Sequence, residues 1–304
     1  MIKLLNKISK RADWEWHKFH DAVFRRMVKA PDVMTYEECI EHILNTRASV
    51  SRFGDGELAV IHGRKLGFQK QDGQLGRKLK NVLTSNSEGL LICIPDTFQN
   101  LERYNQVEQN FWRAHHYYNR KNWLRLLLPG KKYGNTFLSR FYSMEFDRQL
   151  AACRLELLRK LWNNRDIIFV EGRDTKLGVG NELFNNASSI RRVICPAKDA
   201  FAIYDKILDG IKILERADNN LFILALGPTA TVLAADMNSI GLQALDFGHI
   251  DIEYEWYRQG VTKKVPVKGK YSNEAAILGL AKEPVTGVIV NSDYEHQIIL
   301  DLTK

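Results

Sequence analysis

Two carboxylates stand two residues apart in the segment SRFGDGE, which spans residues 51–57. Asp55 and Glu57 directly follow a predicted strand, and in an extended or turning backbone residues i and i+2 can project to one side. Two carboxylates that converge in this way suit a hard cation such as Mg2+ or Mn2+, whose shell is usually completed by water and substrate phosphates. The alternative interpretation is an acidic surface turn, because a DxE triplet alone carries little information.

The neighbours of this pair could serve a phosphate group. Gly54 and Gly56 allow the backbone to turn tightly and a ligand to come close. Arg52 offers a planar fork of donors to a phosphate oxygen. The segment therefore predicts a site for a metal ion together with a phosphorylated ligand.

Two junctions between an apolar strand and a helix could also bind anions. The first, VEGRDTKLGVGN, ends with Gly180 and Asn181, and the second, LGPTAT, contains Gly227, Thr229 and Thr231. In each, a glycine-containing loop opens a predicted helix whose free amides attract phosphate. Neither is a dinucleotide fingerprint, because GVGNEL has leucine where the third glycine belongs, and the sequence has no GxxxxGKS/T run. A plain tight turn is the alternative at both places.

A third cluster, DFGHIDIEYEW, covers residues 246–256 and follows a predicted strand. Its titratable side chains are those of Asp246, His249, Asp251, Glu253 and Glu255. Such a density of ionisable groups at the end of a strand is typical of sites in open α/β sheets. Alternatively, the alternation of Asp251, Glu253 and Glu255 could mark the solvent face of an edge strand.

The segment FWRAHHYY, residues 111–118, mixes aromatic rings with charge. We expect it to form a buried aromatic face of a helix, and stacking on a sugar or a base is the alternative. His115 and His116 are neighbours that point apart on a helix, so they make a poor pair of metal ligands.

The elements that must position these residues follow from the apolar pattern. Thr35 and Glu38 have the spacing of a capping box, so a helix should follow them. Short apolar runs alternate with helical stretches through the second half, which indicates a parallel sheet covered on both faces. The predicted fold is α/β, a Rossmann-like, mostly parallel sheet with helices on both faces and helical additions in the N-terminal half. Predicted strands lie at 48–53, 90–95, 167–170, 193–195, 221–226 and 288–290, and predicted helices at 74–86, 101–127, 144–162, 180–190, 199–216 and 229–240.

The composition is that of an ordinary soluble globular protein. The chain has 304 residues, of which 45% are hydrophobic and 26% are charged. No stretch approaches about 18 uninterrupted apolar residues, which argues against a spanning helix, and the N-terminus lacks the features of a secretory signal. The four cysteines form no CxxC pair, and two of them, Cys93 and Cys195, lie in apolar runs typical of buried thiols in a reducing compartment, so we expect a cytoplasmic protein.

The positive charge is concentrated at the N-terminus. The formal net charge is +8, and residues 1–29 hold eight Lys and Arg against three acids, which gives +5 of the total. Because the rest of the chain is only slightly basic, we expect no nucleic-acid partner. The basic amphipathic segment, residues 1–30, could lie on an anionic membrane surface. The simpler interpretation is a solvated helix that packs its aromatic residues on the main body.

Taken together, these motifs resemble those of the bacterial GT-D-type glycosyltransferases. The resemblance rests on SRFGDGE, on FLSRFY at 137–142, and on the segments 170–201, 224–237 and 246–256, and it runs from about residue 35 to residue 260. It implies a nucleotide-sugar transferase fold in which Asp55-Gly56-Glu57 holds a divalent metal and the donor diphosphate. Residues 31–304 would then form a single glycosyltransferase domain, which extends a glycan of a bacterial surface glycoprotein or polysaccharide.

The resemblance also implies roles for the other candidate residues. The donor would be a hexose linked to UDP, and the cofactor would be Mn2+ or Mg2+. Arg52 and Arg140 would add positive charge beside the leaving diphosphate. The loop amides near Gly180 and Gly227 would position the nucleotide or its phosphates.

An inverting transfer would need a general base. His249, Asp251 and Glu253 are the candidates, with Asp251 preferred. Two other classes of function stay open. A nucleotide-binding oxidoreductase would share the α/β layout but would lack the glycine fingerprint, and a non-enzymatic membrane-surface interaction protein would explain the basic N-terminus.

Overall fold

The apolar runs of the sequence form a parallel sheet. The computed structural model describes residues 2–214, 217–270 and 292–303, and the strands in these residues form a nine-stranded sheet in the order β1-β4-β3-β2-β8-β7-β5-β6-β9. Neighbouring strands in it run parallel, which confirms the predicted α/β fold. The strands are β1 (Asp32–Val33), β2 (Ser49–Arg52), β3 (Leu90–Ile94), β4 (Lys132–Asn135), β5 (Asp166–Gly172), β6 (Ser189–Cys195), β7 (Asn220–Ala225), β8 (Ala244–Asp246) and β9 (Ile298–Asp301).

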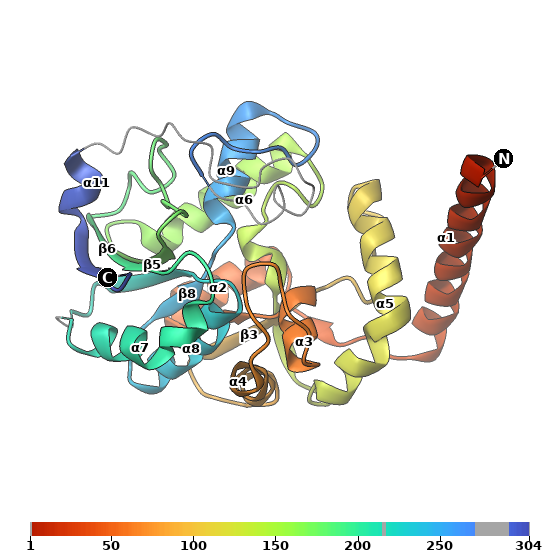
Figure 1. Ribbon diagram of the computed structural model, residues 1–304, viewed down its shortest axis with the longest axis horizontal. Helices are drawn as coiled ribbons and strands as arrows, with labels where there is room; N and C mark the ends of the chain where they lie inside the picture. Colours follow the sequence, from red (N-terminus) through yellow and green to blue (C-terminus); the bar gives the residue numbers. More distant parts are fainter. Residues whose placement is uncertain (1, 215–216, 271–291, 304) are drawn as a thin grey trace.

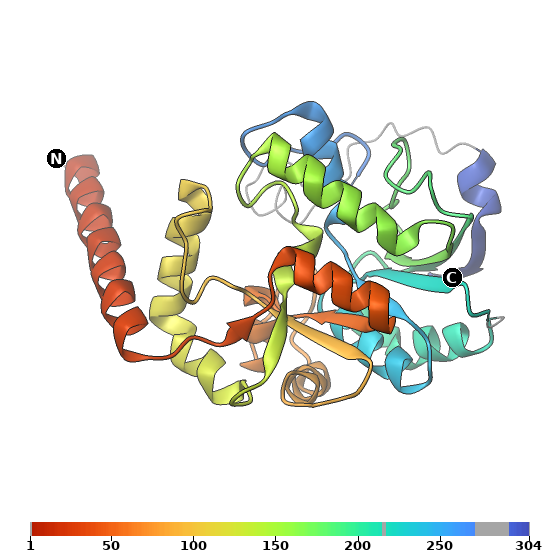
Figure 2. The same cartoon turned by 180° about the vertical axis from the view of Figure 1, so that it is seen from behind.

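Helices cover both faces of the sheet (Figures 1 and 2). One hydrophobic core joins the sheet to α2 (Tyr36–Thr46), α6 (Arg148–Trp162) and α9 (Ile250–Gln259). A second core joins the other face to α3 (Asp55–Ile61), α4 (Gly73–Leu83), α7 (Tyr204–Lys212) and α8 (Pro228–Ser239). Two short 3-10 helices, η1 (Thr136–Ser139) and η2 (Ala200–Ile203), follow β4 and β6, and α11 (Ser292–His296) precedes β9.

Strand β5 shows why the strands read as continuous apolar runs. Ile167 and Phe169 belong to the first core, whereas Ile168 and Val170 belong to the second. Successive side chains of a strand point to opposite faces of the sheet. A strand that is covered by helices on both faces must therefore be apolar throughout.

Helix α2 begins where the capping box predicts. The Glu38 amide donates to Thr35 Oγ1 (3.2 Å), and the Thr35 amide donates to Glu38 Oε2 (2.8 Å). The helix buries Tyr36, Cys39 and Ile43 against the sheet. It therefore fixes the start of β2, and with it the position of the SRFGDGE segment.

The helix predicted over 180–190 does not form, and the chain makes a series of turns there. Gly178 and Gly180 have φ angles of +71° and +76°, which are outside the right-handed helical region. The Asn181 side chain accepts a hydrogen bond from the Leu183 amide (3.2 Å), which replaces a helical backbone bond.

Two other predictions concern the C-terminal part of the chain. The acidic residues from Asp251 to Glu255 lie on α9 and are buried, so the edge-strand interpretation is wrong. The strand predicted at 288–290 lies outside the described residues.

Helix α1 (Ile2–Met27) lies beside α5 (Gln106–Leu126) at one end of the molecule (Figures 1 and 2). The rings of His17 and Tyr117 are 4.6 Å apart, and the buried Asp21 pairs with Arg120. The N-terminal helix thus packs on α5, as the simpler interpretation predicts, but two of its aromatic residues, Trp16 and Phe19, stay exposed rather than packed on the main body. Among the described helices, none combines the length and the apolar character needed to cross a membrane.

Candidate active site

The carboxyl ends of five strands meet at a large cavity. Its volume is about 1080 Å3, and residues at or just after the ends of β2, β5, β6, β7 and β8 line it. Arg52, Gly172, Pro196, Leu226 and Asp246 are the lining residues at these positions. Ligands of open α/β sheets bind at this edge, so the topology alone makes the cavity a candidate active site.

Asp55 and Glu57 line the cavity, but they lie in the first turn of α3 and not in an extended segment. Residues two apart on a helix do not face each other, so the expected convergence of the two carboxylates by backbone alternation is wrong. Glu57 instead turns back and accepts a hydrogen bond from the Gly54 amide (2.8 Å) through Oε2. Both carboxylates remain at a helix N-terminus, where negative charge is favoured.

Three carboxylates of the cavity lie close to one another, those of Asp55, Glu57 and Asp246. Burial, together with the nearby charges of Asp246 and Asp55, raises the pKa of Glu57 to about 7. A divalent cation would offset this repulsion, and carboxylate oxygens are the donors that Mg2+ and Mn2+ prefer. Within the described residues, no group of three or more His, Cys, Asp or Glu side chains is arranged to hold a metal ion by itself. Water and substrate oxygens would therefore have to complete the coordination of a cation held by Asp55 and Glu57.

Arg52 and Asp246 are paired across neighbouring strands. The Arg52 guanidinium lies 3.2 Å from Asp246 Oδ1 and also donates to the Thr136 carbonyl oxygen (3.2 Å). The Thr231 hydroxyl is 3.0 Å from Asp246 Oδ2, within donating distance. Arg52 is therefore a cation held in a fixed orientation in the cavity wall.

Arg140 is the second arginine of the cavity wall. It follows η1, and its Nη2 lies 3.2 Å from His249 Nε2. Because an arginine can only donate, this contact places the acceptor lone pair on His249 Nε2. Arg140 and His249 thus come from segments more than a hundred residues apart and meet at the cavity.

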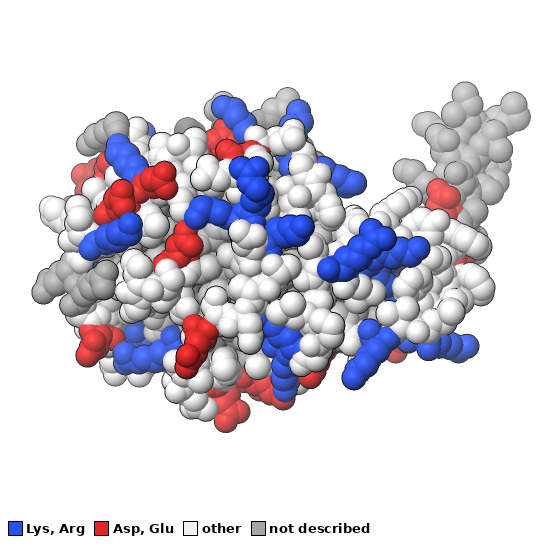
Figure 3. Space-filling view, turned by 90° about the horizontal axis from the view of Figure 1, so that it is seen from below, with Lys and Arg blue, Asp and Glu red and all other residues white. Residues whose placement is uncertain are grey.

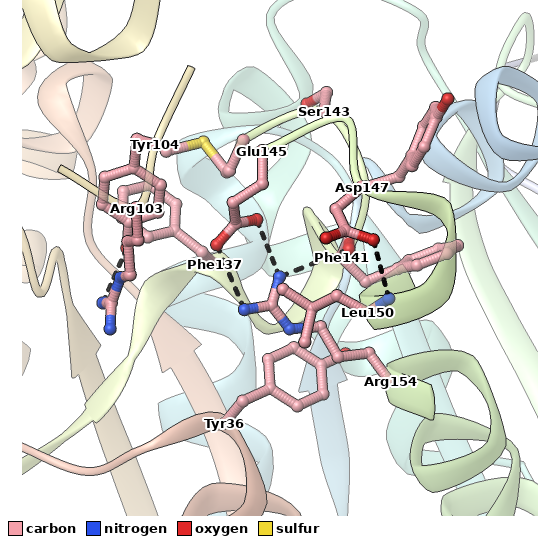
Figure 4. A network of polar contacts seen from close by, with 12 residues as sticks. Tyr36, Arg103, Tyr104, Phe137, Phe141, Ser143, Glu145, Asp147, Leu150 and Arg154 are labelled. Carbon is pink, nitrogen blue, oxygen red and sulfur yellow. Dashed lines mark hydrogen bonds and ion pairs between the residues drawn. The ribbon is translucent and has the colours of Figure 1, made fainter. Parts of the chain in front are cut away.

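The segment that carries Arg140 is fixed by a buried network (Figure 4). Arg154 of α6 donates to both oxygens of Glu145 (2.8 and 3.1 Å), and its guanidinium lies over the Tyr36 ring at 5.0 Å. Glu253 accepts hydrogen bonds from the amides of Tyr142 (3.1 Å) and Ser143 (2.7 Å). These contacts hold the FLSRFY segment against α2, α6 and α9.

Asp251 and Glu253, two of the three candidate bases, are not among the residues that line the cavity. Asp251 contacts Lys270 Nζ (2.6 Å) and accepts from the amide of Gly178 (2.9 Å) and from Asn181 Nδ2 (2.8 Å). Burial raises the pKa of Glu253, and its carboxylate holds the FLSRFY segment through the amides of Tyr142 and Ser143. The structure thus gives these two side chains roles in holding loops, and His249 is the candidate that faces the cavity.

The two predicted anion-binding junctions differ in position. Gly227 lines the cavity, whereas Thr229 and Thr231 are buried below it and support their neighbours. Gly180 and Asn181 are not lining residues, because the loop that contains them is tied to α9. In the first junction, VEGRDTKLGVGN, the residues that line the cavity are instead Gly172 and Thr175.

The sequence analysis did not single out Phe68 or Asp199, and both line the cavity. The Asp199 amide donates to the Phe68 carbonyl oxygen (2.9 Å), and the Phe68 ring lies over Gly227. No motif marks these residues. The φ of +53° at Asp199 is a conformational signal that only the structure provides.

Comparison with known proteins was consistent with this geometry. A family model described as "Glycosyltransferase GT-D fold" matches residues 50–275. The chain is 40% identical over 243 residues to "Probable glycosyl transferase Gly" of Streptococcus gordonii, which covers 80% of this chain and 35% of the relative. It is 36% identical over 241 residues to "Glycosyltransferase GlyD" of Streptococcus pneumoniae serotype 4, which covers 78% of this chain and 29% of the relative. The chain therefore spans about a third of the length of these curated relatives.

Two solved structures are similar over nearly their whole length. One, described as "The highly conserved domain of unknown function 1792 has a distinct glycosyltransferase fold", has a TM-score of 0.85 and 36% identity and covers 92% of this chain and 99% of that chain. The other, "A New Glycosyltransferase (DUF1792) from Streptococcus sanguinis", has a TM-score of 0.82 and 35% identity and covers 90% and 100%.

Proposed function

Because the chain belongs to the family of glycosyltransferases with the GT-D fold, we propose that it transfers a hexose from a nucleotide diphosphate, most simply UDP, to a hydroxyl group of an acceptor glycan. The observation that carries the proposal is the single cavity that Asp55, Glu57, Arg52 and Arg140 all line. Acidic ligands for a cation and fixed guanidinium groups are together suited to a diphosphate leaving group.

Different residues of the cavity would bind the metal ion, the diphosphate and the nucleotide. Asp55 and Glu57 would hold a divalent cation, Mn2+ or Mg2+, which supplies positive charge to the leaving diphosphate. Arg140 lies at the same cavity and would stabilise the charge that develops there. Phe68 and Gly227 bound the part of the cavity at the ends of β6 and β7, where the nucleotide would lie.

An inverting transfer would need a base close to the acceptor hydroxyl. Of the three candidates, we propose His249, which lines the cavity. In the structure the Nε2 lone pair accepts a hydrogen bond from Arg140, so His249 would act as the base only after Arg140 turns from it to the diphosphate.

The experiment is a panel of nucleotide sugars tested for hydrolysis and transfer with Mn2+, with Mg2+ and with excess EDTA. We expect one UDP-sugar to be turned over only with metal, and Asp55→Asn to lower this turnover at least about a hundredfold with the fold intact. Asp209→Asn, an exposed acid far from the cavity, is the matched control. Full turnover by Asp55→Asn, or in excess EDTA, would refute the metal site, and a thermal shift with NAD but not with UDP would favour an oxidoreductase.

We further propose that the reaction takes place in the cytoplasm and that the acceptor is a glycan of a surface glycoprotein or polysaccharide. We also propose that α1 contacts an anionic membrane. Trp16, Phe19 and Met27 lie along one face of α1 and are 54%, 62% and 79% exposed. Lys and Arg side chains gather where the α1–α5 end joins the body (Figure 3). Basic residues near an anionic bilayer contribute about 1 kcal/mol each.

Sedimentation with anionic and neutral vesicles tests the membrane contact. The full chain should bind anionic vesicles at low salt, and the double variant Trp16→Ser, Phe19→Ser should bind them less. Equal, negligible binding of both proteins would leave α1 with its packing role alone.

A further inference from the structure

The cavity extends well beyond the ends of the strands. Its volume of about 1080 Å3 exceeds the roughly 300–1,000 Å3 of a pocket for one small ligand. One part lies at the ends of β5, β6 and β7, where the nucleotide diphosphate would bind. The other part, here called the α5 half, is lined by residues of the first turns of α5, by residues within 136–146 and by residues 262–266. The α5 half therefore offers space for a second substrate.

The α5 half has an aromatic wall. Phe111 and Trp112 line it from α5, and Phe137 lines it from η1. The centroid of the Trp112 ring lies 5.3 Å from that of Phe111 and 5.6 Å from that of Phe137, and both pairs have edge-to-face geometry. The wall rests on a small hydrophobic cluster that is separate from the two cores of the sheet and consists of Leu101, Tyr104, Trp112, Phe137 and Met144. Trp112 and Phe137 are thus held by packing, and Phe111 contacts the cluster through Trp112.

Phe111 is exposed in the cavity, although its neighbour is not. Its side chain is 44% exposed, against 3% for Trp112, and Val107, one turn earlier on α5, is 74% exposed. Residues four apart share a face of a helix, so Val107 and Phe111 present one apolar strip to the cavity. Exposed apolar surface inside a concave site is typical of a ligand-binding surface.

Polar groups surround this strip. Gln106, Thr262 and Lys263 line the α5 half, and Lys264 Nζ contacts Glu108 Oε1 (2.8 Å), which joins residues 262–266 to α5. A saccharide unit has apolar C–H faces that can cover an aromatic ring and hydroxyl groups that need polar partners. A lipid chain would cover these polar groups without satisfying them, which costs free energy. The combination therefore fits a saccharide.

We propose that the α5 half is the acceptor subsite, in which the terminal saccharide unit of the acceptor lies with one face against Phe111. This rests on the proposed function, which assigns the other part of the cavity to the donor. The acceptor hydroxyl oxygen forms a bond to the anomeric carbon of the donor sugar. The bond from that carbon to the diphosphate oxygen breaks, its electron pair stays with the diphosphate, and the hydroxyl proton passes to a base or to water.

The test compares Phe111→Ala, Phe111→Trp and the control Tyr118→Ala in the full chain. Tyr118 lies on the same helix and is 69% exposed, but it does not line the cavity. The probes are p-nitrophenyl β-glucoside and β-galactoside. Three quantities are measured: glycoside binding by titration calorimetry, transfer to the glycoside from a UDP-sugar with Mn2+, and hydrolysis of that UDP-sugar by water.

We expect Phe111→Ala to weaken glycoside binding and transfer by roughly tenfold, while UDP binding and donor hydrolysis stay within twofold. Phe111→Trp should restore binding, and Tyr118→Ala should behave as the natural chain. The proposal is overturned if Phe111→Ala binds and transfers normally, if it lowers hydrolysis and transfer equally, or if the natural chain hydrolyses the donor but binds neither glycoside. Glycoside binding that depends on Phe111 without any donor turnover would support the saccharide site and refute the proposed function alone.

Discussion

Replacement of Gly227 by alanine should destabilise the protein at the donor part of the cavity for two reasons, which two further variants can separate. Gly227 has φ +57° and ψ −142°, a backbone conformation that is essentially restricted to glycine. A Cβ at this position would lie 3.2 and 3.4 Å from two carbons of the Phe68 ring and closer still to a third. The substitution therefore combines backbone strain with steric overlap.

Each cause has a typical magnitude. A side chain in a glycine-only region costs about 1–3 kcal/mol, and overpacking costs about 1–3 kcal/mol. The backbone of Phe68 is held, because its carbonyl oxygen accepts from the Asp199 amide, so only rotation of the ring could relieve the overlap. We expect Gly227→Ala to lower the free energy of unfolding by about 3–4 kcal/mol, which corresponds to a fall in Tm of the order of 10 °C, and to weaken UDP binding.

Urea unfolding measures this loss, and two further variants separate its causes. Gly130→Ala is the matched control, because Gly130 has φ +74° and a Cβ there would meet nothing within 4 Å. The double variant Gly227→Ala, Phe68→Ala removes the overlap and should recover about 1–3 kcal/mol of coupling. A Gly227→Ala protein as stable as Gly130→Ala, or a double variant that recovers nothing, would refute this account of the Phe68–Gly227 contact.

Two other substitutions test the buried networks around the site. Asp251→Ala leaves the buried Lys270 without its closest carboxylate, so it should lower the free energy of unfolding by about 3–5 kcal/mol in urea. Normal stability with complete loss of transfer would instead identify Asp251 as the base. Arg154→Met leaves Glu145 without its bidentate partner, and it should lower both the unfolding free energy and kcat for transfer, because the segment with Arg140 loses its support. An Arg154→Met enzyme with unchanged kcat would show that this network serves stability only.

The sequence predicted strands β2, β3, β5, β6 and β7 because helices cover both faces of the sheet there, but it marked no strand at β1, β4 or β9. The apolar runs around Ile92, Phe169 and Leu224 each became a buried strand, and the capping box at Thr35 marked the start of α2. The helix predicted at 180–190 failed because positive φ angles at two glycines, which the letters alone do not show, break the pattern there. Strand β4 carries glycine in its middle and gave no periodic signal at all.

The site was predictable only in part, because ionisable residues were identified without their partners. Asp55 and Glu57 were placed at the cavity by their position after a strand, although the backbone there is a helix. Asp251 looked equally suited to chemistry, yet Lys270, nineteen residues later, holds its carboxylate in the interior. Whether a carboxylate faces substrate or supports a loop depends on which residues fold against it, and residue spacing does not carry that information.

The aromatic segment of α5 is a residue run whose position at the cavity could not be predicted from spacing either. A buried helix face and a stacking surface have the same composition, and the sequence analysis had to choose between them. The structure divides the segment, since Trp112 and His116 are buried while Phe111 is exposed and lines the cavity. What distinguishes Phe111 is the segment across from it, residues 262–266, which lies some 150 residues further along the chain and reaches α5 through Lys264 and Glu108. A binding surface of this kind is a property of two distant segments together, so it becomes visible only when the fold brings them to the same cavity.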